Sequence, residues 1–120
     1  MATMNEVIAK VDRLKPNAYG DEDKYDWISR LEGMISIQVM DTDAPEYSLP
    51  DDADMPLLVS HPFDDIYELY VSSMIDYHNR EYNNYNNTAL MFQERFDQFK
   101  DWYLRKNPHG KARNFYNVMG

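Results

Sequence analysis

The chain has 120 residues, which fits a single domain with a core of its own. Its 21 acidic and 12 basic residues leave a net charge of −9, and a chain this acidic does not gain affinity for nucleic acid by displacing phosphate counterions. The absence of cysteine excludes disulfides, thiolate nucleophiles and cysteine-based zinc sites, and the longest purely apolar run, the four residues 89–92, is too short for a membrane span.

The start of the chain predicts a short helix over about 3–14. Thr3 and Glu6 have the spacing of a capping box, in which each side chain satisfies a free backbone N–H at the start of a helix. Apolar residues then recur with a period of about 3.6 residues, the pattern of a helix with one buried face. Pro16 ends this pattern because its ring disfavours helical backbone in the preceding residue.

A second helix is predicted over about 23–40, because apolar residues at helical spacing run from Trp27 to Val39. Acidic residues precede this stripe, and they favour the positive end of a helix dipole. Gly33 within the helix costs about 1 kcal/mol relative to alanine, which indicates a close contact at that point.

The connection 41–60 differs in character from the segments around it. Residues 41–54 include six acids and no base, and three prolines interrupt the connection. We therefore predict an acidic, proline-containing loop. The residues leave open a short β-hairpin within it, built from strands at 46–49 and 57–59.

Two further helices are predicted over about 62–82 and 87–106. Ser60 is the expected N-cap of the first. The asparagine-rich segment 83–87 is interpreted as a turn, because asparagine favours turns and tolerates left-handed backbone. An alternative is that its tyrosines form a polar recognition tip. Two helices of matched length joined by a short turn should pack as an antiparallel hairpin.

These elements predict an all-α fold class, namely a small four-helix domain over 1–106 built on the long antiparallel αα-hairpin. Residues 107–120 follow as a basic, aromatic C-terminal tail. This tail either docks on a partner or folds back on its own domain, and the two alternatives have similar weight.

No arrangement of residues in the sequence indicates catalysis. The histidines at 61, 78 and 109 are too far apart to share a helix face, and His78 with Glu81 forms only a weak candidate pair for a metal. Motifs for nucleophilic catalysis, phosphate binding and dinucleotide binding are lacking. We therefore expect no enzymatic activity, no catalytic residues, no metal and no cofactor.

Charge is distributed unevenly along the chain. Residues 1–60 have a net charge of −8 and residues 61–120 a net charge of −1, while the segment 102–120 contains four bases and no acid. Opposite charges on separate parts of one chain suggest complementary contacts between subunits. The candidate interface residues are Asp51, Asp52 and Asp54 on the acidic side, and Arg105, Lys106, Lys111, Arg113, Phe115, Tyr116 and Met119 on the basic side.

Several stretches of the sequence have a recognisable overall pattern, most of them between Leu57 and Lys106. They are Leu57-Leu58-Val59, Pro62-Phe63-Asp64, the run from Met74 to Asn87, the aromatic segment from Phe92 to Trp102, Lys15-Pro16-Asn17, and Trp27 to Leu31. In these stretches the sequence resembles a small protein encoded among the head and neck genes of tailed phages and prophages of Gram-positive bacteria. The resemblance is carried by overall pattern and by no catalytic motif, and segments 41–56 and 107–120 match no part of it.

This group is similar in size and helical plan to head–tail connector (neck adaptor) proteins. The resemblance implies a structural, non-enzymatic subunit of the virion neck that forms a homo-oligomeric ring under the portal. Its implied partners are further copies of itself, the portal protein and a tail-completion protein, and it would pass through the bacterial host cytoplasm during assembly. The alternative is a small acidic protein-binding module of phage or prophage origin, for example a DNA mimic that inhibits a DNA-binding protein.

Overall fold

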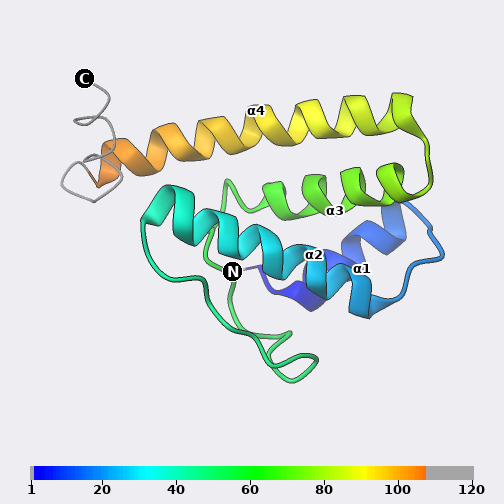
Figure 1. Ribbon diagram of the computed structural model, residues 1–120, viewed down its shortest axis with the longest axis horizontal. Coiled ribbons are helices and arrows are strands. Elements are labelled where there is room, and N and C mark those ends of the chain that lie inside the picture. Colours follow the sequence, from blue (N-terminus) through cyan, green and yellow to red (C-terminus); the bar gives the residue numbers. More distant parts are fainter. Residues whose placement is uncertain (1, 108–120) are drawn as a thin grey trace.

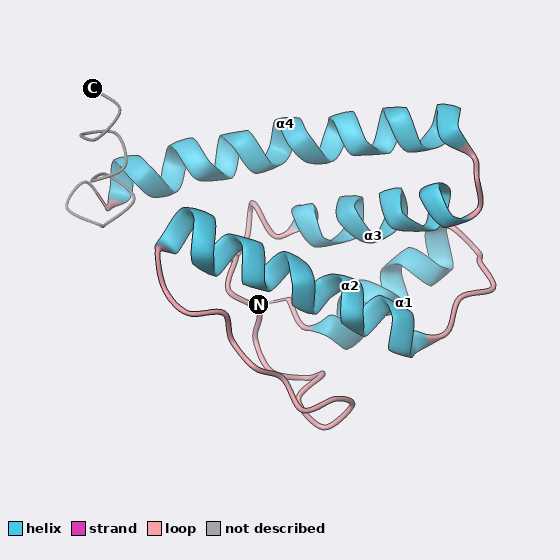
Figure 2. Ribbon diagram, in the orientation of Figure 1, coloured by secondary structure: helices cyan, strands magenta, loops and turns pink. Residues whose placement is uncertain are grey.

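The computed structural model describes residues 2–107, and over that range the chain is all-helical (Figures 1 and 2). The elements are α1 (Met4–Leu14), α2 (Asp21–Met34), the π-helix η1 (Ile35–Met40), α3 (Asp65–His78) and α4 (Tyr82–Lys106). The predicted all-α fold class and the four-helix count are confirmed.

The helix start at Thr3 is confirmed. Its hydroxyl oxygen accepts a hydrogen bond from the backbone N–H of Glu6 at 3.2 Å, which satisfies one of the free donors of the first turn. The predicted apolar face of α1 is buried, with Met4 and Val11 among its members. The second predicted helix is also present, although its last six residues form the π-helix η1. Gly33 lies against the connection that follows, where an added Cβ would meet the Ala44 Cβ at 3.6 Å.

Helix α3 occupies the centre of the molecule. It packs against α1 and α2 on one side and against α4 on the other (Figure 1). Its buried residues therefore lie on more than one face; they are Ile66, Tyr67, Val71, Ser73, Ile75 and Asp76. Helix α4 runs back along α3 in the opposite direction. The two helices are unequal, because α3 has 14 residues and α4 has 25, so the prediction of matched lengths was wrong.

The asparagine-rich segment 83–87 is helical, so its interpretation as a turn was wrong. The chain instead reverses at Asn79–Glu81, where Arg80 adopts left-handed backbone with φ 61°. Asparagine is only mildly unfavourable inside a helix, by roughly 0.7 kcal/mol relative to alanine. The packing of Tyr85 against Tyr77, with ring centroids 5.4 Å apart, helps to hold this first turn of α4 against α3.

The connection between η1 and α3 contains no strand in the part of the chain that the structure describes, so the β-hairpin alternative at 46–49 and 57–59 was wrong. It is nevertheless packed, with Ala53, Leu57 and Val59 each about 98–99% buried in the core. Helix α3 begins at Asp65 and not near 62, because residues 61–64 form turns. Ser60 is not its N-cap; its carbonyl oxygen accepts from the backbone N–H of Phe63 at 3.0 Å.

Candidate functional site

A buried carboxylate fixes the acidic connection to the helices. Glu32 lies in α2 and is fully buried. Its Oε2 accepts hydrogen bonds from the Tyr47 hydroxyl at 2.9 Å and from the Leu58 backbone N–H at 3.0 Å. Its Oε1 accepts from the hydroxyl of Tyr67 in α3, and the same hydroxyl accepts from the Val59 backbone N–H at 2.9 Å. One side chain therefore joins α2, α3 and both ends of the connection.

Burial sets the protonation behaviour of this carboxylate. Loss of water raises the pKa of Glu32 above its ordinary value, although the hydrogen bonds from Tyr67, Leu58 and Tyr47 oppose the shift. The pKa of both tyrosine hydroxyls is also raised, first by their own burial and then by the neighbouring Glu32 charge. The tyrosines therefore remain donors at neutral pH, as the network requires.

The three acidic interface candidates lie together on this anchored connection. Asp51 and Asp54 are exposed and Asp52 is half-buried. The Asp52 carboxylate accepts from the Ser48 backbone N–H at 2.7 Å, and the Asp54 carboxylate accepts from the Asn5 side chain at 2.8 Å. Asp52 and Asp54 are thus held in defined positions, whereas the exposed Asp51 side chain makes no hydrogen bond to the rest of residues 2–107.

Only two of the basic interface candidates, Arg105 and Lys106, lie within residues 2–107. Arg105 and Lys106 are exposed in the last turn of α4, where cations favour the negative end of the helix dipole. This end of α4 lies well apart from the tip of the connection in Figure 1. Within residues 2–107 the structure therefore does not bring Arg105 and Lys106 to the acidic candidates. The remaining candidates lie outside the described residues; they are Lys111, Arg113, Phe115, Tyr116 and Met119.

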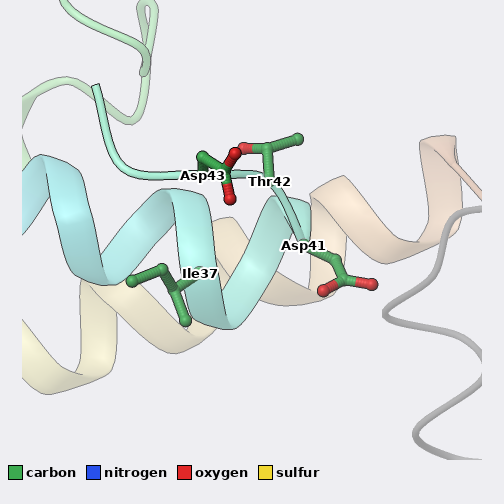
Figure 3. A pocket seen from close by; sticks show the side chains of 4 residues that line it. All are labelled: Ile37, Asp41, Thr42 and Asp43. Atoms are coloured by element: carbon green, nitrogen blue, oxygen red, sulfur yellow. The ribbon is translucent and has the colours of Figure 1, made fainter. Parts of the chain in front are cut away.

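A hollow opens where η1 ends, and Figure 3 shows the residues that line it. Ile37 is 61% exposed although it is a large apolar side chain. Asp41, Thr42 and Asp43 follow directly and are also exposed. Asp41 has left-handed backbone, with φ 53°, and it ends the π-helix. The surface thus combines one apolar side chain with two carboxylates.

His78, one member of the weak metal pair, lies among aromatic rings. His78 stacks on Trp27 with ring centroids 5.4 Å apart, and it contacts the edge of Tyr77. Within residues 2–107, no group of three histidine, aspartate or glutamate side chains is arranged to hold a metal ion. His78 acts here as part of an aromatic cluster at the α3–α4 turn.

Three buried charged residues were missed in the sequence, namely Glu32, Lys24 and Asp76. The Lys24 ammonium contacts Asp12 at 2.7 Å, and both Asp76 carboxylate oxygens accept from Lys15 at 2.7 Å. A signal was present in α2, because Lys24 and Glu32 fall in register with the apolar stripe at Ile28, Leu31 and Ile35. A charge at such a position is buried only with a partner.

Comparisons with known proteins give no relative for this chain. No family model, no curated protein and no solved structure matches it. No helix among the described residues is long and apolar enough to cross a membrane.

Proposed function

We propose that this protein is a structural, non-enzymatic connector subunit of a phage neck, which assembles with copies of itself into a ring under the portal. The observation that supports this proposal most is the rigid mounting of the acidic connection by Glu32. A loop fixed in this way presents its carboxylates at constant positions, as a repeated contact between subunits requires.

The two charged regions fit a head-to-tail contact. Asp51 and Asp54 are exposed on the connection, while Arg105 and Lys106 lie in the last turn of α4. That end of α4 lies apart from the tip of the connection in Figure 1. Because the two regions do not meet within one molecule, each is free to meet its complement on a neighbour. Such a contact uses different surfaces on the two partners, and it closes into a ring when the rotation between subunits allows.

Charge alone does not hold such a ring. An exposed ion pair contributes about 0.2–1 kcal/mol, so these charges set register and association rate. Apolar contacts must supply the rest, and Phe115, Tyr116 and Met119 in the C-terminal segment are the candidates. The portal protein and a tail-completion protein are the proposed partners above and below the ring. The net charge of −9 would let packaged DNA pass through the ring without adhering.

A charge-swap experiment tests the head-to-tail contact. One variant carries Asp51→Lys and Asp54→Lys, and the other carries Arg105→Glu and Lys106→Glu. Asp52 is left unchanged because its carboxylate fixes the turn at Ser48. Each variant alone should self-associate less than the natural chain at low salt, because like charges now face each other. An equimolar mixture should form mixed dimers. In one of its two possible contacts, the new lysines on the connection of one variant meet the new glutamates at the end of α4 of the other, so opposite charges face each other.

Sedimentation velocity with one variant fluorescently labelled measures this association. Mixed species that weaken as salt rises support the proposal, since salt screens exposed pairs. If the mixture associates no more than either variant alone, the acidic and basic surfaces do not pair and the proposed contact is wrong.

A further inference from the structure

We infer that the hollow lined by Ile37, Asp41, Thr42 and Asp43 binds the C-terminal segment 108–120 of the same chain. The contact would be intramolecular, with basic and aromatic side chains of that segment lying on the exposed end of η1. This inference concerns the isolated subunit and does not depend on the connector role; in a ring, the segment would have to leave the hollow to make the apolar contacts proposed above.

The chemistry of the two surfaces is complementary. The hollow offers an apolar side chain, Ile37, with two exposed carboxylates beside it (Figure 3). The segment 108–120 includes Lys111 and Arg113, and aromatic residues follow within three positions of Arg113. An aromatic ring on Ile37 and cations beside Asp41 and Asp43 would satisfy both parts of the hollow.

The position of α4 makes the contact accessible within one molecule. Helix α4 packs against η1, and its C-terminal end lies beside the end of η1 in Figure 1. Residues 108–120 follow directly and can extend up to about 43 Å. Because the segment starts beside the end of η1, reach is not limiting. A tether of this length gives an effective concentration of the order of millimolar, far above that of a second copy in dilute solution.

Thiol labelling tests the inference, because the natural chain contains no cysteine. The reporter is Thr42→Cys, which keeps Ile37 and both carboxylates in place. The matched control is Ala18→Cys, an exposed position in the α1–α2 connection far from the hollow. The measurement is the rate of alkylation by iodoacetamide at micromolar protein, in the full chain and in a chain ending at Asn107.

The thiol introduced by Thr42→Cys should react about fivefold more slowly in the full chain than in the shortened one. This factor follows from an effective concentration of about 1 mM if the segment binds the hollow with a dissociation constant near 0.25 mM. Adding Asp41→Asn and Asp43→Asn, or raising the salt, should remove most of this protection. Asparagine tolerates the left-handed backbone at position 41, so the first change leaves the end of η1 intact. The control thiol introduced by Ala18→Cys should react equally in both chains.

Dilution separates an intramolecular contact from one between copies. Protection that does not change on tenfold dilution supports the inference. Protection that disappears on dilution assigns the hollow to the C-terminal segment of a neighbour and overturns the intramolecular contact, while equal rates in the full and shortened chains show that the segment does not bind there. The charge-swap experiment uses other residues, so its failure and this one are distinguishable.

Discussion

At the residue scale, buried charges determine how the loops and helices of this protein are joined. Glu32 holds the connection, Lys24 with Asp12 joins α1 to α2, and Asp76 joins Lys15 to α3 and α4. A buried charge costs free energy unless it is paired or hydrogen-bonded, and each of these side chains has partners. Truncating one partner should therefore cost far more than truncating an exposed pair.

Glu32 should make stability depend on pH in an unusual direction. Because burial raises the folded-state pKa of Glu32, the folded protein binds this proton more tightly than the unfolded chain does. Its contribution to the free energy of unfolding is therefore greatest at low pH and falls as pH rises through the folded-state pKa. Glu32→Gln removes this titration. Between pH 4.5 and pH 7 the free energy of unfolding of the variant should therefore rise relative to that of the natural chain.

Urea unfolding at several pH values measures this difference, and taking the difference cancels the effects of the other carboxylates. A difference that is constant with pH would show that Glu32 titrates alike in both states. Glu32→Ala is the companion change. It leaves the Leu58 N–H and two tyrosine hydroxyls without their acceptor and should cost about 3–5 kcal/mol.

Lys15→Met tests the second buried charge. The Lys15 ammonium donates to both oxygens of Asp76, whose side chain is 1% exposed, so the substitution leaves an unpaired buried carboxylate. We expect a loss of about 3 kcal/mol, because Lys15 itself is partly exposed and breaking a buried pair costs about 3–5 kcal/mol. Adding Asp76→Asn should recover part of the loss by removing the charge.

The exposed pair Arg30–Asp26 provides the control for this measurement. Its side chains are 72% and 58% exposed, so Arg30→Met should change stability by less than about 0.5 kcal/mol. If Lys15→Met costs no more than this control in chemical unfolding, the Lys15–Asp76 pair does not hold α1 to α3.

At the element scale, hydrophobic periodicity was sufficient to find the helices but not their ends. The aromatic stripe of α4 is buried as its spacing predicted, with Phe92, Phe96 and Phe99 facing the core. The start of α4 was placed too late, because the asparagines at 83–87 were interpreted as a turn. Their weak preference for turns is outweighed by the packing of one long helix along α3. The strand prediction at 57–59 failed for a related reason. Leu57 and Val59 are buried by contacts with the helices and by the bond from Leu58 to Glu32, and neither requires a sheet.

Phe96→Ala tests the packing between α3 and α4. Phe96 is 4% exposed and lies between Phe92 and Phe99, with ring centroids at 5.5 and 6.3 Å. Emptying this position should lower the free energy of unfolding by about 3–5 kcal/mol, because lost burial and a cavity add together. Leu90→Ala on the same helix is the control, since Leu90 is 59% exposed and should lose under about 1 kcal/mol. Equal losses for the two would mean that the stripe does not form the core.

At the scale of the whole molecule, the proposed assembly rests on two charged surfaces at different places in the fold. The chain presents an acidic connection held in place by buried hydrogen bonds, and a separate helix end with two cations. The acidic and basic candidates were evident in the sequence as runs of like charge. The separation of Arg105 and Lys106 from the acidic candidates was not evident there, because it depends on which way α4 runs and on the burial of Glu32. The hollow at the end of η1 was missed as well, since no periodic pattern distinguishes a π-helix from the α-helix that precedes it.

The connector role is tested most directly by the mass of portal complexes. If a portal gene lies in the same gene cluster, as the proposed function predicts, its product would be produced together with this chain, purified, and measured by native mass spectrometry at low salt. The proposed function predicts a portal ring carrying a fixed number of copies of this chain, and fewer copies when Arg105→Glu and Lys106→Glu are present. Portal rings that never carry the chain, or a gene cluster without a portal gene, would contradict it.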